Sequence, residues 1–285
     1  MQRNFGQRSW IFAAILLIAS AWLPARADEP PLRTGVEANF APHAMPKLGG
    51  GAEGFNIDLA HEIGRRLHRE VTIDLTSFST LIPGLQAGRY DFLIAPVTVT
   101  KERAESLLFT EGYMYTGLQF AIRRGSPPLN SLDELRGKAI SVNKGSIYDT
   151  WARNNVEKYG FTIDSYETTP DAVQAVLSGH DYANLNGSSA VRYVAGKNPQ
   201  YVPSLEIADT RAPFAIPLRR DEVPLRDQID NALKCMKQDG TLVKLSEKWF
   251  GVPPGPDALE RVATPGYGVP GMPGYQSDAP APNCG

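Results

Sequence analysis

Apolar and polar residues follow two different periodicities along this chain. Between residues 55 and 67 an apolar side chain returns every three or four positions, which predicts a helix with one buried stripe. Residues 71–75 alternate between apolar and polar, as a half-buried strand does. Residues 92–95 form a short apolar run, which is typical of a strand covered on both faces.

The two patterns take turns over most of the sequence. We expect strands at 32–36, 71–75, 92–95, 118–122, 139–142, near 161 and at 182–185, and helices at 55–67, 81–87, 132–135, 147–158, 170–177, 188–195, 224–238 and 241–250. Alternation of this kind predicts an α/β architecture with mostly parallel sheet.

The composition changes from residue 252 onward, where 14 of the last 34 residues are proline or glycine. The segment holds a near-repeat, with Thr264-Pro-Gly-Tyr-Gly followed by Met272-Pro-Gly-Tyr-Gln. Such a stretch buries too little apolar surface to offset the entropy lost on ordering. We therefore expect residues 252–285 to form an irregular, partly extended tail whose one fixed point is Cys284.

The N-terminus has the three parts of a secretory signal peptide. Arg3 and Arg8 give it a positive start, and residues 10–23 are almost entirely apolar. Residues 24–27 place small side chains at the Ala-x-Ala spacing of a cleavage site. A transmembrane anchor is the alternative, but a span needs about 20 apolar residues and this run is shorter. We expect cleavage near Ala27, which gives an exported, soluble mature chain.

The charge of the mature chain argues against one class of partner. Without Arg3, Arg8 and Arg26, the 29 basic residues fall to 26 against 31 acidic ones, a net charge of −5. A mildly acidic chain without a dense basic run gives no electrostatic reason to expect nucleic acid.

Cys235 and Cys284 are the two cysteines of the chain. In an oxidising compartment they predict one disulfide, with two free thiols as the alternative. Two cysteines without a nearby histidine cannot make a tetrahedral metal site, so we expect neither a metal nor a cofactor. The histidines are scattered, and we expect each of them on the surface or in a helix: His43, His61, His68 and His180.

Several short motifs occur in a specific order and together cover about residues 32–251. They lie at 32–42, 54–60, 81–91 and 98–103, at Phe109, Thr110 and Tyr113, and at 239–241 and 248–251. In order and spacing the chain resembles the family 3 periplasmic solute-binding proteins, the amino-acid receptors of ABC importers. The resemblance implies a type II periplasmic-binding-protein fold, in which two α/β lobes joined by two crossings hold a ligand in the cleft between them.

The resemblance also implies how the chain is divided. Lobe one comprises residues 28–114 and 215–251 and lobe two residues 118–211, with crossings near 115–117 and 212–214. The protein would then be a monomeric receptor in the periplasm that captures a small molecule and delivers it to a permease of the inner membrane. Such receptors close by a hinge motion when the ligand binds.

Arg103 carries the main prediction about the ligand. It lies in the spacing Thr98-x-Thr-x-x-Arg103, where the family uses an arginine to hold a ligand carboxylate. A planar guanidinium can donate two parallel hydrogen bonds to a carboxylate; the alternative is a solvated arginine in the first turn of a helix. Thr98 matches a hydroxyl beside that arginine, with a helix cap or a simple strand residue as the alternative. Pro96 stands where the family often has Ser or Gly, so it offers a carbonyl but no N–H.

Four further positions match the cleft of the family. Phe40 and Phe78 match side chains that wall the pocket, with core packing as the alternative. Glu37 matches an acid near the cleft mouth that can meet a cationic group, with a surface carboxylate as the alternative. Ser146 retains the hydroxyl of a turn that binds the ligand carboxylate at a helix N-terminus, or it is only a helix cap.

One departure from the family concerns the amino group of the ligand. Amino-acid binders of the family carry an aspartate at the position of Gly187 to hold the α-ammonium, and Asn186 is the nearest polar substitute. Burying an ammonium without a negative partner is costly. The sequence therefore predicts a carboxylate-bearing ligand, an amino acid or a derivative, whose α-amino group is not held in the usual way.

Two other functions stay open. A periplasmic enzyme on the same fold, resembling the cyclohexadienyl dehydratases, would need an acid or base from lobe two. The absence of a carboxylate at Gly187 weighs against it, although His180 and Asp181 lie nearby. The other is a binding subunit that reports to a sensor or a periplasmic partner protein through its tail.

Overall fold

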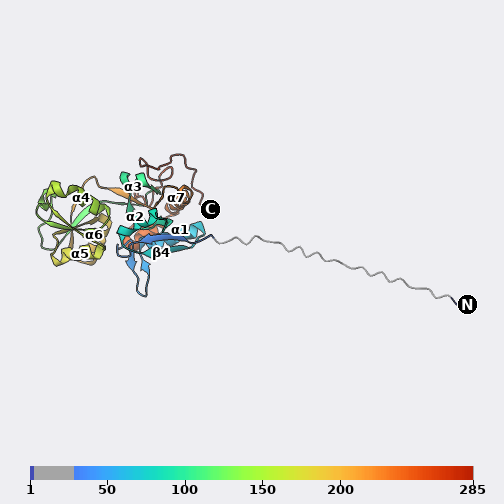
Figure 1. Ribbon diagram of the computed structural model, residues 1–285, viewed down its shortest axis with the longest axis horizontal. Helices are drawn as coiled ribbons and strands as arrows, with labels where there is room; N and C mark the ends of the chain where they lie inside the picture. Colours follow the sequence, from blue (N-terminus) through green and yellow to red (C-terminus); the bar gives the residue numbers. More distant parts are fainter. Residues whose placement is uncertain (3–28, 285) are drawn as a thin grey trace.

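The computed structural model describes residues 1, 2 and 29–284, so the predicted signal peptide lies outside the described residues apart from its first two positions. Two five-stranded sheets form the centres of two lobes, which lie side by side (Figure 1). Among the described residues, every helix is too short or too polar to span a bilayer.

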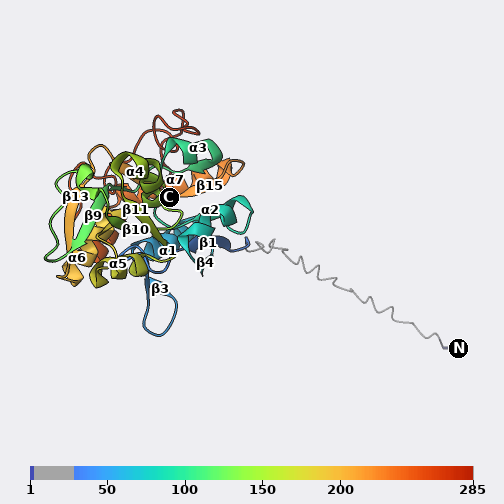
Figure 2. The same cartoon turned by 60° about the vertical axis from the view of Figure 1, so that its left-hand side comes forward.

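The sheet of lobe one has the strand order β4-β1-β5-β15-β7. Its strands are β1 (Leu32–Val36), β4 (Val71–Leu75), β5 (Phe92–Leu93), β7 (Leu107–Phe109) and β15 (Pro217–Arg219). The helices of this lobe are α1 (Phe55–Leu67), α2 (Phe78–Gln86), α3 (Lys101–Ser106), α7 (Val223–Gln238) and α8 (Thr241–Phe250). A hairpin of β2 (Met45–Pro46) and β3 (Ala52–Glu53) projects from this lobe (Figure 2).

The sheet of lobe two has the order β11-β10-β12-β9-β13. Its strands are β9 (Leu118–Arg123), β10 (Ala139–Asn143), β11 (Thr162–Tyr166), β12 (Ala183–Gly187) and β13 (Tyr201–Glu206). The helices are α4 (Ile147–Tyr159), α5 (Thr169–Ser178) and α6 (Ser188–Lys197), and a short 3-10 helix covers Leu132–Leu135.

A third, three-stranded sheet connects the lobes. It has the order β6-β14-β8, formed by β6 (Val97–Thr98), β8 (Met114–Thr116) and β14 (Ala212–Ala215). The chain leaves lobe one through β8 and returns through β14, and these two strands pair antiparallel, with Phe214 opposite Met114. The two predicted crossings are therefore adjacent strands of one small sheet.

The sheets are mixed, and the prediction of mostly parallel sheet is wrong. Only β4-β1-β5 and β11-β10-β12 pair in parallel, and the remaining neighbours in both large sheets are antiparallel. The crossings explain the difference. Strands β9 and β15 each lead away from the junction between the lobes, whereas their neighbours β12 and β5 run towards it.

The helices with a clear apolar stripe lie where the sequence predicts them, each within a few residues. Helix α1 begins after Gly54, whose φ of 143° places it in a region that favours glycine. A side chain at Gly54 would also collide with the carbonyl group of His43. Helix α3 and the strands β2, β3, β6, β7, β8, β13, β14 and β15 were not predicted.

The proline- and glycine-rich tail packs on lobe one beside α7, and the prediction of a single fixed point is wrong. The backbone N–H and the hydroxyl of Thr264 both donate to Glu111 Oε2, at 2.7 and 2.8 Å. The N–H of Gly268 donates to Asp230 Oδ2 at 2.8 Å. Both acids are fully buried, so their carboxylates hold a tail with little apolar surface of its own.

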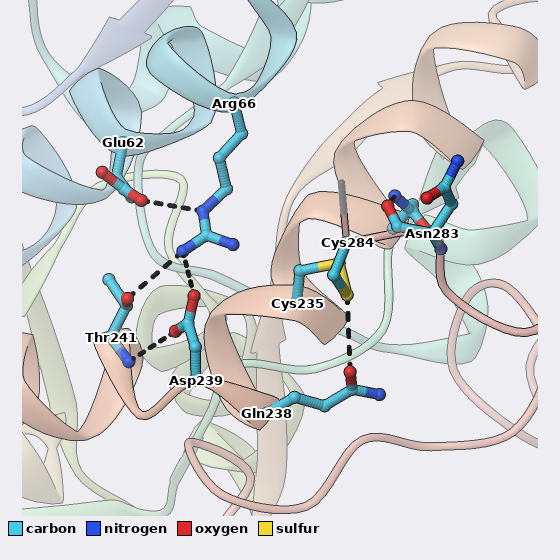
Figure 3. The surroundings of a disulfide bond; sticks show 9 residues. Glu62, Arg66, Cys235, Gln238, Asp239, Thr241, Asn283 and Cys284 are labelled. Carbon is cyan, nitrogen blue, oxygen red and sulfur yellow. Dashed lines mark hydrogen bonds and ion pairs between the residues drawn. A yellow bond between two sulfur atoms is a disulfide. The ribbon is translucent and has the colours of Figure 1, made fainter.

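The predicted disulfide between Cys235 and Cys284 is confirmed, with their Cα atoms 5.4 Å apart (Figure 3). Close to it, Arg66 of α1 donates to Asp239 Oδ2 at 2.6 Å and to Thr241 Oγ1 at 3.2 Å (Figure 3). The end of the tail is thereby joined to α7, where α1 also meets the turn between α7 and α8.

Candidate functional site

A cavity with about 20 Å³ of free volume lies between the lobes, next to the small connecting sheet. Seven of the nine predicted ligand-binding residues line it: Glu37, Phe40, Phe78, Pro96, Thr98, Arg103 and Ser146. Four residues that were not predicted complete the wall: Ala95, Asn143, Ile147 and Tyr148. The two halves of the wall come from different lobes, as a cleft that closes on a ligand requires.

Arg103 reaches the cavity from the first turn of α3, which is capped by the Thr100 hydroxyl. Its guanidinium donates to the carbonyl oxygens of Thr98 at 3.1 Å and of Gly145, in lobe two, at 3.5 Å. The guanidinium carbon also lies 6.0 Å from the ring centre of Phe78. Within residues 29–284 no carboxylate lies within 4.0 Å of this cation.

Burial lowers the pKa of Arg103, because a low-polarity environment disfavours the charged form. A guanidinium nevertheless keeps its proton in proteins. The site therefore presents a positive charge whose hydrogen bonds go to neutral carbonyl oxygens. A carboxylate is the planar anion that fits this donor.

Glu37 is buried rather than exposed, and it faces lobe two. Its carboxylate accepts hydrogen bonds from Asn143 Nδ2 at 2.9 and 3.0 Å. It also accepts one from the N–H of Thr169, the first residue of α5, at 3.1 Å. Burial raises the pKa of Glu37 to about 7, against the lowering effect of these hydrogen bonds. Glu37 thus joins the two lobes through an acid that titrates near neutral pH.

Ser146 is the N-cap of α4, as one of its two predicted roles requires. Its hydroxyl accepts from the N–H of Asp149 at 3.2 Å and donates to the carbonyl of Asn143 at 2.6 Å. The hydroxyl proton is therefore already used within the protein.

Gly187 and Asn186 do not line the cavity, although both are buried at the end of β12. A Cβ atom on Gly187 would lie 2.5 Å from the Tyr148 hydroxyl and 3.0 Å from the Thr116 hydroxyl. The phenol of Tyr148 thus fills the space that an acidic side chain at this position would enter. The Oδ1 atom of Asn186 accepts from the N–H of Gly187 at 2.8 Å, which turns it away from a role in the cleft.

The sequence analysis missed three residues that shape the cleft: Asn143, Tyr148 and Thr169. Asn143 ends strand β10, and polar residues at strand ends are the available signal for it. Tyr148 and Thr169 stand in the first turns of α4 and α5. Their roles depend on the approach of Gly187 and Glu37, which local patterns do not contain.

His43 is fully buried, so the expectation of a surface or helix position is wrong. Its Nδ1 atom lies 2.9 Å from Asn56 Oδ1 and its Nε2 atom 3.1 Å from Ser189 Oγ. Asn56 belongs to α1 and Ser189 to α6, so the imidazole connects the two lobes close to their junction. Burial lowers the pKa of His43 to about 4, which keeps the ring neutral.

Residues 32–252 match the bacterial extracellular solute-binding proteins, family 3, and the chain belongs to this family. The predicted family and its two-lobed fold are therefore confirmed. The chain is 27% identical to the L-cystine-binding protein TcyJ of Escherichia coli K12 over 248 residues, 84% of this chain and 92% of that protein. It is 26% identical to the lysine/arginine/ornithine-binding periplasmic protein of the same strain over 227 residues, 77% and 87% of the two chains.

The comparison with solved structures also finds amino-acid-binding proteins. An ancestral arginine-binding protein bound to arginine superposes with a TM-score of 0.74 at 31% identity, over 78% of this chain and 99% of that one. The ancestral amino acid-binding protein AncCDT-1, a precursor of cyclohexadienyl dehydratase, gives a TM-score of 0.71 at 29% identity, over 77% and 95%. These relatives are binding proteins, and the chain is similar to receptors for amino acids.

Proposed function

We propose that this chain is the periplasmic receptor of an ABC importer and that its ligand is a small carboxylate, an amino acid or a derivative of one. The observation that carries the proposal is Arg103, a cation at the wall of the cleft that lacks an acidic partner in residues 29–284. A ligand carboxylate supplies that partner and displaces the weak contact to Gly145. The receptor works as a monomer and hands the ligand to a permease of the inner membrane.

The other end of the ligand meets Glu37 and Tyr148. Because the Tyr148 phenol fills the space beside Gly187, an α-ammonium group has no acid there to pair with. Glu37 is the carboxylate that the cleft does offer, and it can pair with a cation or, when protonated, donate a hydrogen bond. We therefore expect a ligand whose second polar group reaches Glu37, such as a side-chain amine or a modified amino group.

Closure depends on the two crossing strands β8 and β14. Because they are paired to each other, a change in their backbone torsions rotates one lobe against the other as a rigid body. The ligand stabilises the closed form to the extent that it binds residues of both lobes. Arg103 in lobe one and Tyr148 in lobe two meet this requirement.

The first experiment identifies the ligand and then removes Arg103. A thermal-shift screen of the mature protein over amino acids, opines, amines and organic acids finds compounds that raise the melting temperature. Titration calorimetry then compares the wild type with Arg103→Ala and with Lys101→Ala, an exposed neighbour on α3. We expect Arg103→Ala to lose about 100-fold in affinity, because two charge-assisted hydrogen bonds disappear, and Lys101→Ala to bind as the wild type does.

A carboxylate ligand that binds Arg103→Ala and the wild type equally well contradicts this role of Arg103. A screen in which only compounds without a carboxylate raise the melting temperature contradicts the proposed ligand class.

Glu37 favours a second candidate function, that of an enzyme on the same fold. A buried acid whose pKa lies near 7 is suited to proton transfer, and it borders the cleft of a chain similar to a precursor of cyclohexadienyl dehydratase. Incubation with prephenate or arogenate tests for an aromatic product. Product formed by the wild type and absent with Glu37→Gln supports the enzyme, whereas binding without turnover supports the receptor.

A further inference from the structure

Three side chains that could bind a metal ion converge in lobe two, away from the ligand cleft. They are Asp164 of β11 and the adjacent residues His180 and Asp181, which follow α5. Each offers one ligand atom, and these atoms all lie within 4.8 Å of one another. His180 Nε2 lies 3.9 Å from Asp164 Oδ2.

The fold brings these residues together although 16 positions separate Asp164 from His180. Helix α5 ends at Gly179, whose φ of 83° reverses the chain towards β11. The N–H of Asp181 then donates to the carbonyl of Ala175 at 3.1 Å, which fixes the loop. Asp164 and Tyr166 lie on the same face of β11, because side chains two apart on a strand point the same way.

Asp181 is the residue of this cluster whose surroundings most favour a bound cation. Its exposed fraction is 2%, and its Oδ2 atom accepts from the Tyr166 hydroxyl at 3.1 Å. Its Oδ1 atom is buried and accepts no hydrogen bond from an N–H or hydroxyl group in the part of the chain that the structure describes, and the Asp164 carboxyl group lies within hydrogen-bonding reach of Asp181. A buried carboxylate oxygen left without a partner is costly, and a second carboxylate beside it adds repulsion.

No basic side chain of the described residues compensates these acids, apart from His180 itself. Neither Asp164 nor Asp181 forms an ion pair with a lysine or arginine in residues 29–284. The nearby guanidinium of Arg123 lies against Gly179 instead. One imidazole and two carboxylates, with an unpaired buried oxygen among them, therefore remain as a set of donors.

We propose that Asp164, His180 and Asp181 bind one divalent transition-metal ion, with zinc as the best match. Imidazole suits zinc, copper, iron and nickel, and carboxylates complete such sites. Bonds of about 2.0–2.2 Å in tetrahedral geometry place ligand atoms about 3.4 Å apart. His180 is exposed, so a small rotation of its side chain closes the remaining gap, and water takes the fourth position.

This site is separate from the ligand cleft. Glu37 binds the N-terminus of α5, whereas His180 and Asp181 follow its C-terminus, and a ten-residue helix is about 15 Å long. Metal binding therefore does not depend on which solute the cleft accepts. No metal was expected from the sequence, because the two cysteines have no histidine nearby and the histidines are scattered; only the fold joins these three residues.

The experiment uses the untagged mature protein, freed of metal with EDTA and titrated with zinc chloride in a calorimeter. We expect one zinc ion per chain at this site, and at least a tenfold loss of affinity in His180→Ala and in Asp164→Asn. The matched control is His61→Ala, which removes an exposed histidine of α1 and leaves the affinity unchanged. Both site variants change exposed or half-exposed residues, and melting curves in EDTA verify that they fold as the wild type does.

Two results overturn the proposal. One is the absence of zinc binding by the wild-type protein. The other is zinc binding that His180→Ala and Asp164→Asn retain with unchanged affinity, which places the ion elsewhere on the chain.

Discussion

Two sets of charged side chains in lobe one, one buried beneath the tail and one half-buried in the cleft, differ in how they are paired. Below the tail, Lys234 Nζ lies 2.6 Å from Asp230 Oδ1, and Lys237 Nζ lies 3.1 Å from Glu111 Oε2. Two acids and two bases thus compensate one another. In the cleft, Arg103 contacts only carbonyl oxygens and the face of Phe78.

The difference separates charges that hold the fold from a charge that is available to a ligand. A buried charge with a fixed partner is strongly destabilising to disturb, because removal of one member leaves the other uncompensated. A half-buried cation such as Arg103, whose only partners are neutral, can be removed with less harm to the fold. It also gains more from a new anion than a paired cation would.

The largest effect should come from breaking the paired group. Asp230→Ala leaves Lys234 without its closest anion and removes the acceptor of the N–H groups of Glu111 and Gly268. We expect the free energy of unfolding to fall by about 3–5 kcal/mol. In the same urea titration, Arg103→Ala should change it by less than about 1 kcal/mol. Equal losses in the two variants contradict the distinction between the groups.

Removal of the disulfide shows how much of the stability that the tail contributes comes instead from the buried acids that bind it. Its two cysteines are 49 positions apart, so replacing both by serine should lower the free energy of unfolding by about 2–4 kcal/mol. The contacts of Thr264 with Glu111 remain, and we expect deletion of residues 252–285 to destabilise the protein more than the double replacement does. Thermal unfolding of the two variants under identical conditions gives the order, and the reverse order contradicts the role of the charges.

The smallest change in the free energy of unfolding is expected for Glu37, and this change depends on pH. Burial raises its pKa to about 7, so between about pH 4.5 and pH 7 the folded protein holds a proton that the unfolded chain has released. The stability contributed by this group is therefore complete below that range and falls as the pH rises. Relative to the wild type, Glu37→Gln should gain about 2 kcal/mol between pH 5 and pH 8.

Chemical denaturation of both proteins across that range provides the measurement. The titration of His43 works in the opposite direction, because its pKa is lowered, but it is common to both proteins and cancels in the difference. A difference that does not change with pH contradicts the buried position of Glu37.

Much of the fold, and seven of the eleven residues that line the cleft, could be predicted from the sequence. The long helices α1, α7 and α8 carry their apolar stripes in local spacing, and Arg103 and Phe40 lie in ordered motifs. The strands of the connecting sheet have two to four residues and pair with distant segments, so no local pattern marks them.

The remaining errors have a common physical cause. The tail was expected to be loosely held because only its apolar surface was considered, whereas buried acids contributed by other segments hold it. The part that Tyr148 plays follows from its distance to Gly187, which is 39 positions away in the chain. Both features arise from partners remote in sequence.

Phe40 adds an apolar contact between the lobes to the hydrogen bonds that Glu37 makes. It precedes lobe two by nearly 80 positions, yet it packs into the hydrophobic core of that lobe and is 7% exposed. Together with the bonds from Glu37 to Asn143 and Thr169, it works as an internal latch. Each opening must return an aromatic ring and a carboxylate to water, so the ligand does not have to supply all the energy of closure. The protein itself therefore sets the equilibrium between its open and closed forms. A substitution that weakens or strengthens this latch would change the ligand affinity without altering any contact to the ligand.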